Sequence, residues 1–507
     1  MNFTFSYKSP KPSQIPSADS PLYYDPEGTY APNELKTLFI FVAAGRMIYN
    51  FSGIVPMIPL GIGSLVAYLK QHGYHNNAVL DQPGWGLSEK ALFPLLLQHP
   101  FDLYALSTNI FSLSTALRLA QFVKERVNPK STVVIGGPSG AFAPETILSE
   151  CQGVDAVQVG EGETAILRMI KLKAQGKEIK NIPGLYWREG NYIRNGGKFH
   201  PIDLTEAPLP FRNLFPNDKY HIHPPLGVYG RVASLESIRG CDYGCNFCSI
   251  QHAVRFRAIE QVLEEMSRLI LQGYREFHFI DPTFSIDQER AWLLCEAIIR
   301  KLPEKIYWSC KNRLDTVTFP LLKLMKRAGC YTISYGVESG DNDILYRIKK
   351  SIDAKIIRKT LRDTHEAGIR SLAYILIGSP GETLLTVKST VDLMKDEKVD
   401  FVLFGEMMPD TDSPLFRNLI HQGVISKEAV KSMILNENRD KFQGYTPSGR
   451  DRETISKWLS YANRAFYGRP AYILQRIRGM LSLRDVYNML YGVINLVKEF
   501  GRKDIYD

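Results

Sequence analysis

The chain has 507 residues, of which 44% are hydrophobic and 23% are charged, and its formal net charge is +9. This length exceeds what one hydrophobic core supports, and the balance is that of a globular protein, so we expect two or three domains. No apolar run reaches the roughly 18 residues that a membrane span needs, and the polar N-terminal segment lacks the apolar region of a signal peptide. These features exclude an integral membrane protein, and we expect a cytoplasmic one.

Much of the excess positive charge lies near the C-terminus. We expect these residues to form a solvated helical face. The alternative is weak contact with an anionic substrate, a redox partner or a membrane surface. The sequence contains no module typical of RNA or DNA binding, so we expect no nucleic-acid partner. The basic residues concerned are Arg464, Arg469, Arg476, Arg478, Arg484, Lys498, Arg502 and Lys503.

From residue 37 the chain alternates short apolar runs with helical patterns, which is typical of a parallel α/β sheet. Five such strand–helix units predict one doubly wound, Rossmann-like domain over residues 37–180, preceded by a flexible segment over residues 1–36. The expected strands are residues 38–44, 77–81, 102–108, 132–137 and 155–163.

A hairpin over residues 184–195 and a Pro-rich linker are expected within residues 181–226. A second alternating series predicts a partial (β/α)6 barrel over residues 227–425, with its chemistry at the C-terminal ends of the strands. Residues 426–507 are expected to be helical. The strands expected in the barrel are residues 232–238, 275–281, 306–312, 331–338, 370–378 and 400–408.

Three of the seven cysteines, Cys241, Cys245 and Cys248, have the spacing C-x3-C-x2-C directly after an expected strand. Three thiolates on one tight loop can bind three corners of a [4Fe–4S] cluster and leave one iron open to an external ligand. A zinc site is the alternative, and His252 could supply its fourth ligand. The other four cysteines are scattered, and we expect them to be buried structural thiols.

The segment RGCDYGCNFC resembles the cluster loop of the radical S-adenosylmethionine (SAM) superfamily, including Phe247 before the last cysteine. The resemblance implies that Cys241, Cys245 and Cys248 hold the cluster and are catalytic. It also implies that the open iron binds the methionine part of SAM. A low-potential donor such as flavodoxin or ferredoxin would supply the electron that cleaves SAM to a 5′-deoxyadenosyl radical.

Two acidic residues follow later strands at places where this family contacts SAM. The resemblance assigns Asp281 to the methionine amino group, a charge-assisted hydrogen bond; the alternative is a strand-ending Asp in an Asp–Pro turn. It assigns Glu338, in YGVESGDNDIL, to the ribose or methionine part. Because a glutamate in so apolar a run needs a partner or a function, the alternative is a structural ion pair, for example with Arg313.

The segment YILIGSPGET resembles a later strand motif of the same family. The resemblance places Ile375 and Ile377 near the adenine of SAM and gives Gly378 the role of allowing close approach. Glu382 is expected to be the first-turn acid of the next helix.

The first domain, with IGGPSGAFAPETIL and DAVQVGEGE, resembles the cobalamin-binding domain of B12-dependent radical enzymes. The resemblance implies that Gly136, Gly137 and Gly160 let the backbone approach the flat corrin ring. It makes Ser107 and Thr108 candidate hydroxyl contacts to the dimethylbenzimidazole tail.

This domain departs from many B12 proteins, which carry D-x-H-x-x-G after the first strand. Residues 43–53 contain no His or Asp, which fits cobalamin bound without a histidine ligand and also fits a domain that binds none. Trp85 follows the second strand, where it either stacks above the ligand plane or belongs to the core.

The resemblance covers about residues 37–425 and implies radical chemistry on a small-molecule substrate. Its commonest form is methylation of an unreactive carbon: one SAM supplies the methyl group by way of cobalamin, and a second supplies the radical. The alternatives are a radical cyclase or rearrangement enzyme that does not methylate, and a non-catalytic iron–sulfur or cobalamin-binding protein. Tyr467 and Tyr472 could stack on a flat substrate, but helical core packing is the commoner explanation.

Overall fold

The computed structural model describes residues 21–43, 57–138, 143–220, 226–250, 252–302, 305–435, 447–480, 482–483 and 485–486. The chain divides into two compact units. The first contains residues 1–45, 58–201 and 210–219, and the second contains residues 46–57, 202–209 and 220–507. Among the residues with described positions, no helix combines the length and the hydropathy that a membrane crossing requires.

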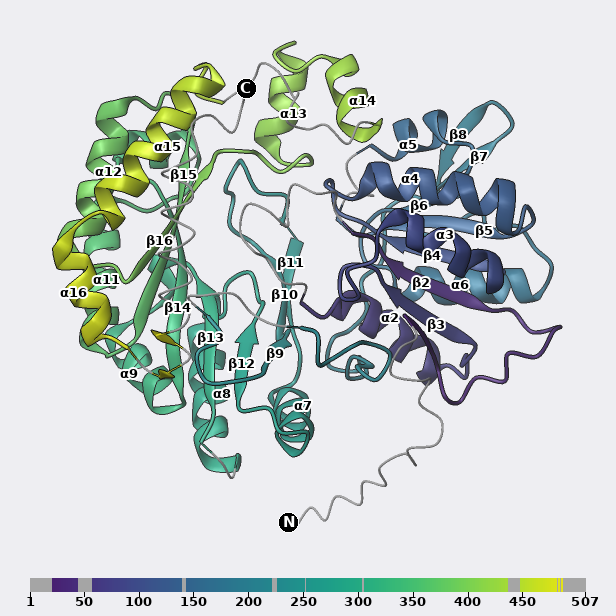
Figure 1. Cartoon of the computed structure of the whole chain (residues 1–507), viewed down its shortest axis with the longest axis horizontal. Helices are drawn as coiled ribbons and strands as arrows, with labels where there is room; N and C mark the ends of the chain where they lie inside the picture. Colours follow the sequence, from purple (N-terminus) through teal and green to yellow (C-terminus); the bar gives the residue numbers. More distant parts are fainter. Residues whose placement is uncertain are drawn as a thin grey trace. The chain divides into compact units, whose positions relative to one another are not determined.

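The first unit is built on an eight-stranded sheet with the order β1-β3-β2-β4-β5-β6-β7-β8 (Figure 1). Its five central strands are parallel, and β1, β7 and β8 add antiparallel edges. The strands are β1 (Leu22–Tyr24), β2 (Thr37–Phe41), β3 (Asn77–Asp81), β4 (Leu103–Ser107), β5 (Thr132–Gly136), β6 (Ala156–Gln158), β7 (Leu185–Glu189) and β8 (Tyr192–Asn195).

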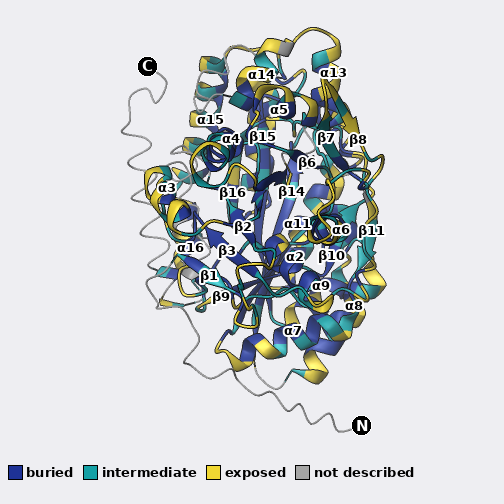
Figure 2. Cartoon of the chain, turned by 90° about the vertical axis from the view of Figure 1, so that its right-hand side faces the viewer, coloured by how far each residue is buried: buried dark blue, intermediate teal, exposed yellow. Residues whose placement is uncertain are grey.

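The five parallel strands are those that the sequence predicted, and each is followed by a helix. Strands of a parallel sheet are covered on both faces, which is why all five residues of β3 are buried (Figure 2). The expected hairpin is also present, as β7 and β8. The helices are α2 (Leu60–Gln71), α3 (Glu89–Gln98), α4 (Leu113–Phe122), α5 (Pro144–Glu150) and α6 (Glu163–Ala174).

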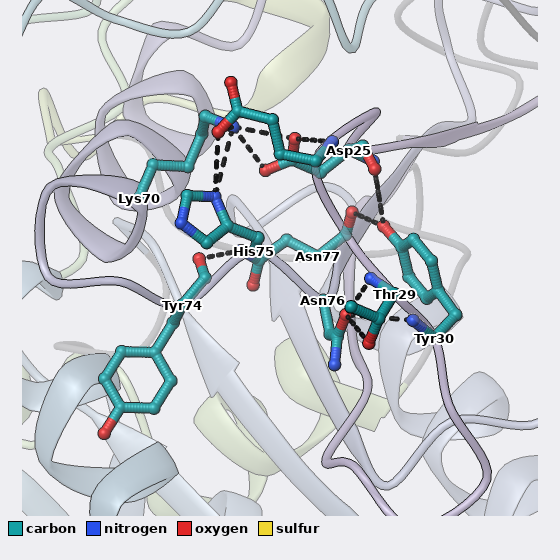
Figure 3. A network of polar contacts seen from close by, with 9 residues as sticks. Asp25, Thr29, Tyr30, Lys70, Tyr74, His75, Asn76 and Asn77 are labelled. Atoms are coloured by element: carbon teal, nitrogen blue, oxygen red, sulfur yellow. Dashed lines mark hydrogen bonds and ion pairs between the residues drawn. The ribbon is translucent and has the colours of Figure 1, made fainter. Parts of the chain in front are cut away.

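The expectation of a flexible segment over residues 1–36 is wrong for its described C-terminal part. Strand β1 pairs with β3, and its Leu22 is fully buried. Beyond β1, the ammonium of Lys70 on α2 lies between the carboxylates of Asp25 and Glu27, at 2.7 and 3.0 Å (Figure 3). His75 completes this group, at 3.1 Å from Glu27. Because an ammonium already lies among these ligand atoms, we interpret the group as an ion-pair network that ties the segment to α2.

The second unit contains a six-stranded parallel sheet with the order β16-β15-β14-β13-β12-β9. Its two edge strands do not pair with each other, so the sheet is the expected partial barrel. The strands are β9 (Val232–Leu235), β12 (Glu276–Phe279), β13 (Tyr307–Asn312), β14 (Cys330–Glu338), β15 (Arg370–Ile377) and β16 (Phe401–Glu406).

Helices cover one face of this sheet (Figure 1). On that face, Trp308 of β13 donates to Ala328 after α9, and the hydroxyl of Tyr335 of β14 meets that of Thr364 on α11. Neighbouring residues in each strand point the other way, to what we call the interior face. The helices are α7 (Ile259–Leu271), α8 (Gln288–Lys301), α9 (Phe319–Arg327), α10 (Asn342–Arg347), α11 (Ala354–Glu366), α12 (Leu384–Asp396), α13 (Pro414–His421), α14 (Lys427–Leu435), α15 (Arg452–Tyr467) and α16 (Pro470–Arg478).

The expected strand over residues 232–238 is in fact split. It ends with β9 at Leu235, and a separate antiparallel hairpin follows, formed by β10 (Ile238–Cys241) and β11 (His252–Phe256). The turn between β9 and β10 is held by the buried carboxylate of Asp281, as described below. This hairpin carries the first cysteine of the C-x3-C-x2-C motif.

The C-terminal helices pack on β16. The contacts involve Tyr467, Tyr472 and Arg476, for which the sequence allowed two interpretations. The Tyr467 hydroxyl donates to the Val402 carbonyl at 2.6 Å, and the Tyr472 hydroxyl donates to the Asp400 carbonyl at 2.9 Å. Arg476 is buried and forms an ion pair with Asp400 at 3.0 Å. Core packing is therefore the explanation for both tyrosines, and Arg476 does not belong to a solvated face. Arg484, Lys498, Arg502 and Lys503 lie outside the described residues.

Candidate functional site

The three cysteines of the motif lie on one short segment at the end of the β10–β11 hairpin. Cys241 ends β10, and Cys245 and Cys248 lie in the turn that follows, where the Cys248 N–H donates to the Cys245 carbonyl at 3.3 Å. None of the three cysteines forms a disulfide, and the Ile250 N–H donates to the Cys248 sulfur at 3.4 Å. The turn thus gathers three thiols within eight residues.

Backbone contacts from distant segments fix this cysteine loop. The Asn246 N–H donates to the Ile348 carbonyl at 3.2 Å, and the Asn246 carbonyl accepts from the Leu415 N–H at 2.7 Å. The carbonyl of Phe247 accepts from the Asp410 N–H at 2.8 Å. Phe247 therefore contributes backbone as well as its half-buried ring to the loop.

Arg313 follows β13 and places its guanidinium beside the cysteine loop. It lies 3.5 Å from the Cys245 sulfur and 3.7 Å from the centre of the Tyr243 ring. Asp315 forms an ion pair with the Arg313 guanidinium at 2.9 Å. The same guanidinium also donates to the Lys350 carbonyl at 2.7 Å. A fixed positive charge beside a sulfur ligand complements the negative charge of a metal-bound thiolate. In the sequence, Arg313 was expected only as a partner for Glu338.

Glu338 at the end of β14 is paired with Lys350, at 2.8 Å, and not with Arg313. Both side chains are buried, and Glu338 has φ +66°, which is rare for a residue other than glycine. A Cβ on Gly336 would lie 2.6 Å from the Glu338 carboxylate and 2.8 Å from the Lys350 ammonium, so a side chain there would displace this pair. Strained backbone that aims a charged pair is a frequent property of functional sites.

Asp281 is fully buried, and both of its carboxylate oxygens accept hydrogen bonds from the turn before β10. One oxygen accepts from the N–H groups of Ser237 and Ile238, at 2.6 and 3.0 Å, and the other accepts from the Ser237 hydroxyl at 2.6 Å. Burial raises the pKa of Asp281 to about 6. These contacts favour an anchoring role, and the expected contact with the methionine amino group stays a prediction.

The end of β15 is closed by Glu382, whose carboxylate accepts from the N–H groups of Gly378 and Ser379, at 2.5 and 3.1 Å. Glu382 precedes α12, so the expectation that it belongs to the first turn of that helix is wrong. Gly378 has φ +97°, and a Cβ there would contact Ile455 of α15 at 3.3 Å. The Gly378 turn is therefore packed against a helix of the same unit.

The pKa of Glu382 is raised by burial to about 7, so we expect a pH-dependent effect of Glu382→Gln. The unfolded chain loses this proton near pH 4.5, whereas the folded chain keeps it until about pH 7, so stability falls as the pH rises through this window. Relative to wild type, Glu382→Gln should gain up to about 3 kcal/mol between pH 4.5 and pH 8. Anaerobic urea unfolding at pH 5 and pH 8 measures the difference. The exposed control Glu260→Gln should show no such trend, and a pH-independent difference for Glu382→Gln would contradict the assignment.

Ile375 and Ile377 are buried on the helix-covered face of β15. They alternate with Tyr374 and Leu376, which point to the interior face and are only half-buried. The expectation that Ile375 and Ile377 lie near the adenine stays a prediction, and in this orientation it would be met by their backbone. Any contact of this strand with a ligand in the barrel comes from Tyr374, Leu376 or the backbone.

In the first unit, the candidate residues after β4 and β5 lie next to each other. The Thr108 hydroxyl donates to the Gly136 carbonyl at 3.1 Å, and a Cβ on Gly137 would lie 2.6 Å from the Thr108 carbonyl. Thr108 and Gly137 thus pack against each other. Ser107 is half-exposed, and a Cβ on Gly136 would meet nothing within 4 Å, so these two positions are the open ones.

Two further positions in this unit have partners within the protein. The Phe199 ring covers Gly160 so closely that a Cβ there would clash with it, so Phe199 by itself requires a glycine at this position, and the expected approach to a corrin ring stays a prediction. Trp85 lies 6.0 Å from the Tyr23 ring and beneath the Lys219 ammonium, so it belongs to the packing around β1. Residues 44–53, where a cobalt-ligating histidine would be sought, lie outside the described residues.

Comparison with protein-family models assigns both units. A model of the radical SAM superfamily matches residues 235–394, and a model of the B12 binding domain matches residues 55–170. The chain belongs to the radical SAM enzymes that carry a B12-binding domain. The sequence-based family and fold class are both confirmed.

Individual relatives agree with this family. An uncharacterized methyltransferase of Pyrococcus horikoshii is 29% identical over 446 residues, which span 85% of this chain and 93% of that protein. The anaerobic magnesium-protoporphyrin IX monomethyl ester cyclase of Cereibacter sphaeroides is 26% identical over 72% of this chain and 60% of that protein. The solved structure of the radical SAM methyltransferase TsrM of Kitasatospora setae, with cobalamin and a [4Fe–4S] cluster bound, covers 77% of this chain and 79% of TsrM, with a TM-score of 0.65 and 18% identity.

The cofactors of this family are the expected ones, a [4Fe–4S] cluster, SAM and cobalamin. The radical SAM domain fits the cluster, because it offers three cysteines outside disulfides on one loop, with Arg313 beside Cys245. Burial raises the pKa of Cys241 and raises that of Cys248 to about 11, so iron binding must displace both protons. In the B12-binding domain, Ser107 and Gly136 are the candidate positions that remain open to a ligand. The zinc alternative rested on His252, whose side chain is not among those described.

Proposed function

We propose that this radical SAM enzyme methylates an unactivated carbon of a small-molecule substrate. The observation that carries the proposal is the combination in one chain of a B12-binding domain and a radical SAM domain with the C-x3-C-x2-C loop. When bound, the cluster supplies the electron that cleaves SAM, and cobalamin carries the methyl group. The name of the Pyrococcus horikoshii relative, which spans most of both chains, supports methyl transfer.

In the radical SAM domain, residues at the ends of several strands would bind the cluster and SAM. Cys241, Cys245 and Cys248 would hold three irons, and Arg313 would balance the negative charge at Cys245. The buried Glu338–Lys350 pair, one strand further along the sheet, would present a carboxylate and an ammonium to the polar groups of SAM. The positions in which these residues hold SAM matter more than the strength of each contact. Radical chemistry requires the reacting atoms to be held in place and water to be excluded.

A product assay tests methyl transfer. The protein is purified anaerobically, iron, sulfide and cobalamin are measured, and the reduced enzyme receives SAM with a deuterated methyl group and a small-molecule extract. We expect equal amounts of S-adenosylhomocysteine and 5′-deoxyadenosine, and a product in which one deuterated methyl replaces one hydrogen. A cluster-containing protein that binds no cobalamin would contradict this proposal and leave the radical chemistry intact.

A radical cyclase is the second candidate, because the cyclase of Cereibacter sphaeroides matches 72% of this chain. Such an enzyme would form 5′-deoxyadenosine without S-adenosylhomocysteine and would transfer no deuterium to its product. The same assay therefore separates the two functions.

A further inference from the structure

The interior face of β13 carries a lysine below the cysteine loop. Lys311 lies two residues before Arg313, and the extended backbone between them points both side chains to the same face, about 7 Å apart along the strand. Asn312, between them, points to the helix-covered face. Lys311 is thus one layer deeper in the barrel than the groups beside the cluster loop.

The ammonium of Lys311 forms no ion pair or hydrogen bond with any residue whose position is described. The nearest acidic influence is Asp281, whose oxygens are already used by Ser237 and Ile238. Lys311 is half-buried, and desolvation lowers the pKa of its ammonium. His278, on the neighbouring strand, supplies no negative charge: burial, and after it the charge of Lys311, lower its pKa to about 3, so its ring is neutral.

Buried hydroxyls lie beside this lysine. Ser334 of β14 is directly opposite Lys311 in the parallel register, and Thr332 faces the same way one layer deeper. Both hydroxyls are fully buried; that of Thr332 has no hydrogen-bond partner among the described residues, and that of Ser334 lies beside the Tyr374 hydroxyl. Leaving a buried hydroxyl unpaired costs about 1–3 kcal/mol, so buried hydroxyls next to an ammonium without an acceptor indicate a ligand with acceptor atoms.

The same face becomes apolar toward the open edge of the sheet. Leu403 of β16 lies opposite Tyr374 of β15 and is 48% exposed, although a leucine inside a barrel is normally buried. Leu376 lies further along β15 on the same face. The interior face therefore offers a cation and hydroxyls on β13 and β14, and hydrocarbon on β15 and β16.

We propose that Lys311 and Ser334 bind an anionic group of the substrate, a carboxylate or a phosphate, and that the apolar residues of β15 and β16 contact its hydrocarbon part. The substrate class is thus an organic acid or phosphate ester with an apolar body. This inference rests on the proposed function in one respect, that the enzyme acts on a small molecule. The methionine carboxylate of SAM has the same chemistry, and the test must separate the two sources.

Octanoate serves as the probe, with octan-1-ol as its uncharged match, and binding to the anaerobic holoenzyme is followed by calorimetry. We expect octanoate to bind at least about tenfold more tightly than octan-1-ol, since a charge-assisted hydrogen bond contributes about 1.5–3 kcal/mol. Lys311→Met should remove this preference, and Lys311→Arg should keep it. The exposed lysine before the same strand provides the control Lys305→Met, which should bind as wild type. The readout is binding, so it is independent of whether methyl transfer occurs.

Three outcomes would overturn the proposal. In the first, Lys311→Met weakens SAM binding at least tenfold and leaves octanoate binding unchanged, which assigns the site to SAM. In the second, octanoate and octan-1-ol bind wild type equally. In the third, Lys311→Met loses iron and stability that Asp281→Asn restores, which makes Lys311 a structural counter-charge. Ser334→Ala guards against misfolding: it should weaken octanoate binding about threefold or more with little change in the melting temperature, because within the protein only the contact with the Tyr374 hydroxyl is lost.

Discussion

Cys245→Ala protein is expected to bind substantially less iron and to form 5′-deoxyadenosine at least about 100-fold more slowly than wild type. Cys245 is the buried cysteine of the loop and the one whose sulfur lies beside Arg313. Without it, only two thiols remain for a cluster that the family holds with three. Iron and sulfide analysis, the absorption spectrum and the rate of deoxyadenosine formation after reduction measure the loss.

Cys295→Ala is the matched control for this variant. Cys295 is a fully buried free thiol on α8, so its replacement removes the same atom from the radical SAM domain without touching the cysteine loop. We expect it to retain iron and deoxyadenosine formation. A Cys245→Ala protein that generates deoxyadenosine at the wild-type rate would overturn the assignment of the cluster ligands.

Hydrophobic periodicity predicts the parallel strands of both units well, because most of their residues are buried and read as an apolar run. The elements that it missed depend on contacts distant in sequence. The β10–β11 hairpin begins where Asp281 holds Ser237, 44 residues earlier, and no local pattern shows this. Strand β1 similarly depends on Lys70, which holds Asp25 across 45 residues.

The candidate site likewise contains parts that a local sequence pattern reveals and parts that depend on contacts between separate segments. The cysteine loop could be found because its spacing is local, whereas the Glu338–Lys350 pair joins a strand end to a loop 12 residues later. The motif that pointed to Ile375 and Ile377 is local, but which residues of the strand face the barrel interior depends on the pairing of β15 in the sheet, since a period of two places alternate residues on opposite sides. Gly160 was assigned to the corrin ring from the family resemblance, whereas in the structure the group that lies against it is Phe199, distant in sequence.

Asp281→Ala is expected to lower the free energy of unfolding by roughly 3 kcal/mol and to reduce the bound iron, since two buried N–H groups and a hydroxyl lose their acceptor. The turn at Ser237 and Ile238 starts β10, and β10 ends at Cys241, so this loss should reach the cluster loop. Urea unfolding and iron analysis on anaerobic protein measure both effects.

Asp281→Asn separates an anchor from a charge partner of SAM. Its amide oxygen can still accept both backbone N–H groups, and its NH2 group can donate to the Ser237 hydroxyl oxygen, so the turn keeps its hydrogen bonds without the charge. If Asp281 is an anchor, the variant should keep its iron, and its affinity for SAM should stay within about threefold of wild type. If the carboxylate instead contacts the methionine ammonium, the variant keeps its iron but binds SAM at least about tenfold more weakly, because a charge-assisted hydrogen bond is lost. Equilibrium binding of SAM to the two cluster-containing proteins decides between these roles, and the buried geometry of Asp281 leads us to expect the first.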